Sequence, residues 1–298
     1  MWADTLTEEE VRASLEAAVE LRGVDWAGPL LRRTRDIVDR LLAGVDDREA
    51  YRANPLPISD HSLLFELRFA RELLRAGAGA QYEFRAGVGN SDVDFKVDAD
   101  RPWLVELVSL RESEGVRSAT RSDGVRQSLV LRTGADDPKH TEESEMLAAQ
   151  RRIGAKAFGG GRPIKFPEPS EFLHAIVVDA RGYLGAGSGD WIDWMQIAAG
   201  PDSVTIPELV KSLRDRETGA YKPIRGLFEA ACPLEAAATV QARVHFIFFV
   251  CERTFAPGEI AAKAFAVGNT ELLGGAEKAK AAFRTWPLRR SENPPRQK

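Results

Sequence analysis

The sequence predicts an α/β protein in which a mixed central sheet is preceded and followed by helices. Two segments, Phe172–Ala180 and Arg243–Cys251, are almost continuously apolar, which is typical of strands in a sheet covered on both faces. Residues 60–110 add an amphipathic helix and three shorter strand candidates. A chain of 298 residues is long enough for one large domain of this class.

The amino-terminal segment predicts a helical extension. Residues 6–45 contain two amphipathic stretches, and Thr7 followed by Glu10 has the pattern of a capping box at the start of the first. Pro29 begins the second stretch, and a break at Asn54–Pro57 marks the entry to the core. The expected division is a helical extension over 1–55, a core domain over 56–255, and a carboxy-terminal helix near 274–284 with a disordered tail within 256–298.

One predicted helix, residues 60–77, carries a glutamate on its apolar face. Glu66 shares this face with the apolar stripe Leu63, Leu67, Ala70, Leu73 and Leu74. The charged residues that fall outside the stripe are Arg68, Arg71, Glu72 and Arg75. Because a buried carboxylate without a partner is costly, Glu66 needs a cation, which is either an arginine at the rim or a metal ion.

A β-hairpin after this helix brings two carboxylates together. The strand candidates are residues 81–86, 92–97 and 103–110. A five-residue turn over 98–102 joins the last two and sets the register so that Phe95 faces Val105. Asp94 then lies directly opposite Glu106, and like charges about 5 Å apart on a sheet repel each other. A magnesium ion between them would relieve this repulsion, because it binds carboxylate oxygens.

The rest of the chain predicts a long loop and further helices. Residues 111–140 are rich in Ser, Gly and Thr, and a helix is expected over 141–158 and near 190–199. The loop carries several arginines, among them Arg111, Arg117, Arg121 and Arg126. They could contact phosphates, and a solvated loop without a ligand is the alternative.

Composition argues against several classes of protein. Two cysteines and four scattered histidines lack the spacing of a zinc site or a disulfide framework. The acidic amino terminus has no apolar segment typical of a signal peptide, and the longest apolar run falls far short of the about 20 residues of a membrane helix. A cytoplasmic protein is therefore expected. The net charge of −4 argues against tight non-specific nucleic-acid binding, although a basic groove on an acidic body is compatible with it.

The order of these features resembles the PD-(D/E)XK nuclease superfamily over roughly residues 60–180. The resemblance rests on Glu66 in its helix, Asp94 in the segment SDVDF and Glu106 in the segment WLVELV. It implies a restriction-endonuclease-like αβββαβ core that hydrolyses nucleic-acid phosphodiesters, with DNA as the expected substrate. It also implies Asp94 and Glu106 as ligands of Mg²⁺ or Mn²⁺, and Glu66 as an accessory ligand or a group that positions water.

One departure from the family pattern concerns its lysine. This residue should follow Glu106 by two positions, where the sequence has Val108. Lys96 is one substitute, because it lies on the same sheet face as Glu106. Lys156 is the other: it lies beside the apolar stripe of the helix expected after the long loop, with Gln150 nearby. Since the lysine can migrate to the neighbouring helix in this superfamily, Lys156 is favoured, and a solvated lysine at the helix rim is the alternative.

Three functions are compatible with this interpretation. The first is a metal-dependent nuclease. The second is a catalytically inactive member of the superfamily that binds nucleic acid or another protein. The third is a structural or interaction protein whose acidic cluster is paired internally with arginines. A homodimer is compatible with each of them.

Overall fold

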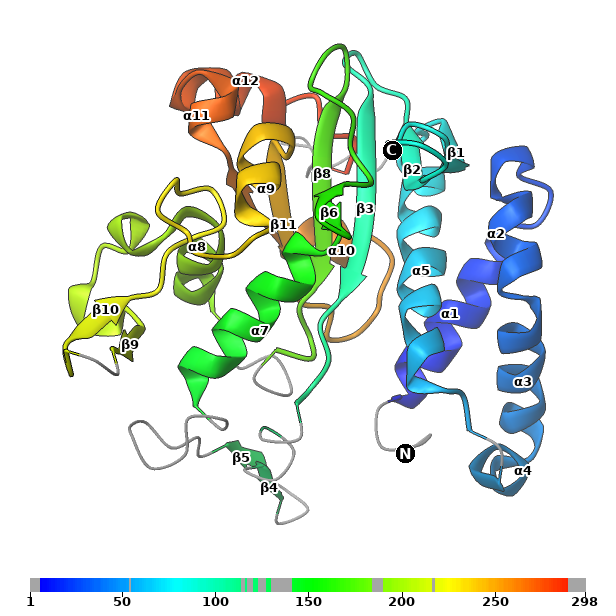
Figure 1. Cartoon of the computed structure of the whole chain (residues 1–298). Helices are drawn as coiled ribbons and strands as arrows, with labels where there is room; N and C mark the ends of the chain where they lie inside the picture. The colour runs from blue at the N-terminus through cyan, green and yellow to red at the C-terminus, as the bar shows by residue number, and fades with distance from the viewer. Residues whose placement is uncertain are drawn as a thin grey trace, which may run out of the picture.

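A six-stranded mixed sheet forms the centre of the protein, in the strand order β1-β2-β3-β8-β11-β12 (Figure 1). The computed structural model describes residues 6–53, 55–113, 116, 120–122, 127–129, 141–183, 190–215 and 218–288. The strands are β1 (Ala80–Phe84), β2 (Val93–Val97), β3 (Trp103–Ser109), β8 (Leu173–Asp179), β11 (Phe246–Val250) and β12 (Ala264–Gly268). β1, β2 and β3 are antiparallel, β8 and β11 run parallel to β3, and β12 is antiparallel to β11. The predicted α/β class with a mixed sheet is confirmed.

The two long apolar runs form the interior strands, as their composition predicts. β8 and β11 are buried along their whole length and are neighbours within the sheet. The second run gives a shorter strand than expected, because Arg243 is the last residue of helix α9 (Ala237–Arg243).

Two helical layers enclose the sheet (Figure 1). The helices that pack on it include α5 (His61–Arg75), α7 (Glu142–Gly154) and α8 (Trp191–Ala199). α5 and the amino-terminal helices cover one face, whereas α7, α8 and α9 cover the other. Residues of β3 alternate between the two cores: Val105 lies under α5, and Leu104 and Val108 lie under α7.

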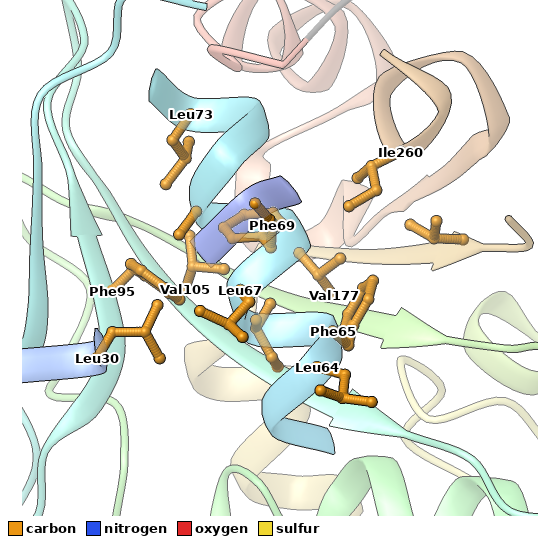
Figure 2. Close-up of a cluster of buried hydrophobic side chains, with 14 of the residues drawn as sticks. Leu30, Leu64, Phe65, Leu67, Phe69, Leu73, Phe95, Val105, Val177 and Ile260 are labelled. Carbon is orange, nitrogen blue, oxygen red and sulfur yellow. The ribbon is translucent and has the colours of Figure 1, made fainter. Parts of the chain in front are cut away.

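Figure 2 shows the core on the α5 side of the sheet. Leu67 and Phe69 of α5 lie among strand residues that include Phe95 and Val105, and all four are fully buried. Burying an apolar side chain of this size contributes about 1.5–3 kcal/mol. This packing fixes α5, and with it Glu66, against the sheet.

The amino-terminal segment is helical, as expected. α1 (Glu8–Glu20) begins after Thr7, whose hydroxyl accepts a hydrogen bond from the N–H of Glu10 at 3.1 Å. The second predicted helix is interrupted at Thr34. The remaining elements of this segment are α2 (Gly28–Arg33), α3 (Arg35–Asp46), α4 (Arg48–Ala53) and the 3-10 turns Asp25–Ala27 and Ile58–Asp60.

The charged side of α5 is buried as well as its apolar stripe. Arg68 and Arg71 are fully buried and Glu72 is nearly so, although the helical pattern places them outside the apolar stripe. Arg68 forms ion pairs with Glu10 of α1 at 3.1 Å and with Glu252, which follows β11, at 3.0 Å. The helical pattern alone does not indicate this burial, because an amphipathic pattern is typical of a helix with water on its polar side. In this protein α1 and the segment after β11 lie there instead.

Several short elements lie in segments for which the sequence predicts no regular structure. They are the strand pairs β4 (Thr120–Ser122) with β5 (Gln127–Leu129), β6 (Phe158–Gly159) with β7 (Arg162–Pro163), and β9 (Ser212–Arg214) with β10 (Tyr221–Pro223), the 3-10 turns Pro201–Ser203 and Pro207–Leu209, and helices α10 (Glu259–Lys263) and α11 (Thr270–Leu273). The predicted carboxy-terminal helix is α12 (Ala276–Phe283), and the predicted tail after residue 288 lies outside the described residues. Within the described ranges, no helix combines the length and the apolar character needed to cross a bilayer.

Candidate functional site

Asp94 and Glu106 lie next to each other where the β2–β3 ladder ends. The predicted register is confirmed, because Phe95 pairs with Val105. At the next position the two carboxylates replace ladder hydrogen bonds. The N–H of Asp94 donates to Oε1 of Glu106 at 3.2 Å, and the N–H of Leu107 donates to Oδ2 of Asp94 at 2.7 Å. Each carboxylate is thus held by the backbone of the other strand.

Glu106 is the more deeply buried of the two carboxylates. Its side chain is 0% exposed, against 13% for Asp94, and it projects from β3 on the face that α7 covers. Burial, and next the negative charge of Asp94, raise the pKa of Glu106 to about 8. Glu106 therefore either takes up a proton or needs a nearby cation to stay ionised.

Lys156 supplies a positive charge directly beside this pair. It follows the end of α7, and its Nζ lies 3.3 Å from Oε2 of Glu106 and 3.8 Å from Oδ2 of Asp94. Burial by itself lowers the pKa of Lys156, but the nearby carboxylates outweigh this effect and raise the pKa above its usual value. The ammonium group is therefore charged. Its side chain remains 30% exposed, so a ligand can reach it.

The other residues predicted around the lysine position have different contacts. Nζ of Lys96 lies 3.7 Å from Oδ1 of Asp98, in the turn after β2. The buried amide of Gln150 donates hydrogen bonds to the carbonyls of Ile197 and Arg225, at 3.0 and 2.7 Å. Gln150 therefore ties α7 to α8 and the segment beyond it, and the structure brings Lys156, in preference to Lys96, to the carboxylates.

A second lysine, which sequence reasoning missed, also reaches Glu106. Nζ of Lys165 lies 3.4 Å from Oε1 of Glu106 and donates to the carbonyl of Asp92 at 2.6 Å. Lys165 follows β7 in a short segment whose sequence has neither helical nor strand periodicity, so no pattern signals the direction of its side chain. We refer to Asp94, Glu106, Lys156 and Lys165 as the carboxylate–lysine cluster.

Glu66 lies on the α5 side of the sheet, in surroundings of its own. Its Oε2 accepts a hydrogen bond from the hydroxyl of Tyr82 at 2.7 Å and lies 3.9 Å from the guanidinium of Arg33. Burial, and next the charge of Asp94, raise the pKa of Glu66 to about 7. The expected three-carboxylate pocket therefore forms only in part. Asp94 and Glu106 are in contact, whereas Glu66 is linked to Asp94 only by the electrostatic effect of one charge on the other. An arginine at the rim, one of the two partners expected for Glu66, is present as Arg33.

Tyr82 and Arg33 were not singled out from the sequence. Tyr82 lies on β1 opposite Phe95, and its hydroxyl also accepts a hydrogen bond from Arg33 at 2.7 Å. Tyr82 is buried, and a strand pattern says nothing of its hydrogen-bond partner. Arg33 comes from α2, far away in the sequence, and only the tertiary fold brings it to Glu66.

The arginines predicted to bind phosphate can be located only in part. Arg111 is exposed directly after β3. Arg121 lies in β4, where its backbone pairs with Ser128 of β5. Arg117 and Arg126 lie outside the described residues. The proposed phosphate contacts of this segment stay a prediction.

The donor chemistry of Asp94 and Glu106 fits a hard divalent cation. Mg²⁺ and Mn²⁺ prefer oxygen ligands, and Mg²⁺ needs only one or two carboxylates beside water and phosphate oxygens. Oε2 of Glu106 is buried and accepts no well-aligned hydrogen bond, so it can serve as such a ligand. Within the part of the chain that the structure describes, no three or more His, Cys, Asp or Glu side chains are arranged around one centre. Glu66 is thus not a third ligand in this arrangement.

Comparison with known proteins finds no match. No protein-family model matches the chain, and neither does any curated protein or any solved structure. The function proposed for this cluster therefore rests on its geometry and chemistry, together with the resemblance of its sequence motifs.

Proposed function

We propose that the chain is a divalent-metal-dependent nuclease of the PD-(D/E)XK type, with a restriction-endonuclease-like core. Two features support this proposal. Elements α5, β1, β2, β3, α7 and β8 occur in the order αβββαβ, with the short strand pairs β4–β5 and β6–β7 inserted before and after α7. The first three strands are antiparallel, and β8 is parallel to β3. The observation that carries the proposal is the position of Lys156, 3.3 Å from Glu106 and 3.8 Å from Asp94.

Lys156 compensates in space for the lysine that is missing in the sequence. Val108 occupies the expected strand position and packs in the core under α7. Lys156 approaches the same carboxylates from the end of that helix. A charged ammonium group at this point can stabilise the negative charge that develops on phosphate oxygens during hydrolysis.

The proposed reaction is hydrolysis of a phosphodiester bond in DNA. A water oxygen forms a bond to phosphorus while the bond from phosphorus to the leaving sugar oxygen breaks. The attacking water loses a proton to solvent, and the leaving oxygen takes one up. Asp94 and Glu106 would hold Mg²⁺ or Mn²⁺, which when bound lowers the pKa of a coordinated water and neutralises phosphate charge. Lys156 donates hydrogen bonds to a non-bridging phosphate oxygen.

The charge balance of the cluster favours a second candidate function. Lys156 and Lys165 already neutralise Asp94 and Glu106 without a metal ion. An inactive member of the same family, acting as a nucleic-acid-binding or protein-interaction module, would use the exposed parts of these lysines and would not cleave its ligand.

Cleavage assays separate the nuclease from the inactive module. Purified protein with Mg²⁺ or Mn²⁺ is expected to nick supercoiled plasmid or cut single-stranded DNA. Glu106→Ala and Lys156→Met should each lower the rate by at least about 100-fold, because each removes a group that acts on the transition state. Lys96→Met is the matched control, since Lys96 contacts Asp98, and should cleave at the wild-type rate. Unchanged cleavage in Glu106→Ala contradicts the assignment.

Calorimetry with Mn²⁺ tests the metal site independently of activity. The wild-type protein is expected to bind Mn²⁺, and Asp94→Ala is expected to lose this binding. If the wild-type protein binds no Mn²⁺ either alone or with DNA, or if the variant binds it as the wild type does, the metal site is wrong and the acidic cluster is structural. Metal binding without cleavage supports the inactive module.

A further inference from the structure

Lys165 is a second cation beside Glu106. The two lysines lie next to different oxygens of the same carboxylate. Lys156 lies beside Oε2 of Glu106, whereas Lys165 lies 3.4 Å from Oε1. The Lys165 ammonium also donates to the carbonyl of Asp92, directly before β2. Its side chain is 25% exposed, so one part of the ammonium group faces the glutamate and another can face a ligand.

The backbone around Lys165 holds it in a defined place. The strand pair β6–β7 folds the chain back after α7, so that the N–H of Ile164 donates to the carbonyl of Ala157 at 3.2 Å. The carbonyl of Ile164 in turn accepts the N–H of Val88 at 3.1 Å. A Cβ atom on Gly87 would come within 2.7 Å of that carbonyl, so the close approach requires glycine there. Lys165 is thus fixed both to the end of α7, beside Lys156, and to the turn before β2.

When both carboxyl groups are ionised, as metal binding requires, the charges of the cluster sum to zero in the absence of a ligand. Asp94 and Glu106 bring two negative charges, and Lys156 and Lys165 bring two positive ones. A divalent cation alone would leave this largely buried cluster with an excess of two positive charges, which is unfavourable in a medium of low polarity. A phosphodiester alone would meet lysines whose charges are already compensated. When the cation and two phosphates are bound together, the net charge returns to zero. The carboxylates would then bind the cation, and the two lysines would be free to donate hydrogen bonds to phosphate oxygens.

We propose that Lys165 is a second phosphate-contacting residue, and that Lys156 and Lys165 make the binding of the divalent cation and of nucleic-acid phosphate mutually dependent. This inference rests on the proposed function and goes beyond it, since it states how binding of the metal ion and binding of the substrate depend on each other. Metal binding releases the two ammonium groups from Glu106 and Asp94. The phosphate backbone then accepts hydrogen bonds from both.

The test compares Mn²⁺ binding with and without DNA. Calorimetry is done on the full chain alone and with a short duplex of phosphorothioate linkages, which resist hydrolysis. In the wild-type protein the duplex should tighten Mn²⁺ binding by about 5–150-fold, the range of coupled binding sites. In Lys165→Gln, Mn²⁺ should bind more tightly without DNA because a competing charge is gone, while the enhancement by the duplex should shrink at least about threefold.

Two further variants separate this role from a loss of structure. Lys165→Arg keeps the positive charge and should retain most of the enhancement, and Lys96→Gln should behave as the wild type. A merely damaged site would bind Mn²⁺ more weakly in both conditions. If Lys165→Gln shows the wild-type enhancement, or weaker Mn²⁺ binding without DNA, the inference about Lys165 is overturned while the nuclease proposal stands. If the wild-type protein binds no Mn²⁺ in either condition, the proposed function falls, and this inference with it.

Discussion

At the scale of single residues, His174 and His245 are two imidazoles buried at the start of the parallel strands β8 and β11. Nδ1 of His245 accepts the backbone N–H of His174 at 3.0 Å and must therefore be unprotonated. Nδ1 of His174 lies 2.7 Å from the carbonyl of Arg243, so it carries its proton and donates there. Burial is the first cause that lowers the pKa of His174 to about 4 and that of His245 to about 3.

These shifts predict that the two histidines lower the stability of the folded protein in mild acid, whereas the raised pKa values of Glu66 and Glu106 act in the opposite direction. In the unfolded chain both histidines titrate near pH 6.5, whereas in the folded protein they stay neutral until about pH 4 or below. Between these limits the two imidazoles bind more protons in the unfolded state, so their contribution to stability falls as the pH falls, by up to about 1.4 kcal/mol per pH unit for each histidine. Urea denaturation at several values between about pH 7.5 and 4.5 measures this slope. The double variant His174→Gln, His245→Gln lacks this contribution and should therefore lose less stability than the wild type on acidification, and an equal dependence on pH in the two proteins would contradict the explanation.

The residues of the site could be predicted from the sequence where local geometry decides their position. Asp94 and Glu106 follow from strand parity and a five-residue turn, and Lys156 follows from its place near a helix. Lys165 and Arg33 depend on chain reversals and on packing between distant segments, for which a single sequence contains no periodic signal. The catalytic use of these groups stays a prediction, because geometry alone does not test it.

At the scale of elements, α5 shows both the strength and the limit of periodicity. Its apolar stripe predicts the face that packs on the sheet, because burial of apolar surface drives that contact. Its charged face is buried by α1, and no pattern within α5 indicates this. β12 was missed for a related reason: residues 264–268 form a short edge strand that is only partly buried and pairs with β11 alone. Interior strands have long apolar runs, but edge strands do not.

The ion pairs of Arg68 are predicted to hold α1 to the core. Arg68→Met leaves Glu10 and Glu252 buried with one cation fewer, and removing one partner of a buried pair typically costs about 3–5 kcal/mol. Arg75→Met is the matched control on the same helix. Arg75 pairs with Glu20 at the surface, where such a pair contributes about 0–1 kcal/mol. Urea denaturation of both variants measures the difference. A similar loss of unfolding free energy in the two variants would show that the buried ion pairs of Arg68 contribute no more to stability than the exposed pair of Arg75.

At the scale of the whole molecule, one apolar core connects segments from both ends of the chain. Leu6, which precedes α1, and Leu30 of α2 lie in the same cluster as Val105 of β3 and Trp286 near the carboxy terminus. Trp286 stacks on Phe248 of β11 with ring centres 4.4 Å apart. The core over 56–255 suggested by the sequence thus shares its packing with the segments before and after it, because β12 extends its sheet and α1 covers α5.

The fragment 56–255 is therefore predicted not to fold on its own. Without the amino-terminal helices, Arg68 and Arg71 become exposed together with the apolar surface around them, and without the carboxy-terminal segment β11 becomes an edge strand. Loss of Trp286 alone, a large residue in a close-packed core, costs about 3–5 kcal/mol, which is much of the usual stability of a domain. Circular dichroism and thermal unfolding compare the fragment with the full chain and with Trp286→Ala in the full chain. The fragment should lack a cooperative transition, and Trp286→Ala should unfold cooperatively at a lower temperature. A fragment that unfolds cooperatively near the midpoint of the full chain would show that the core is an independent domain.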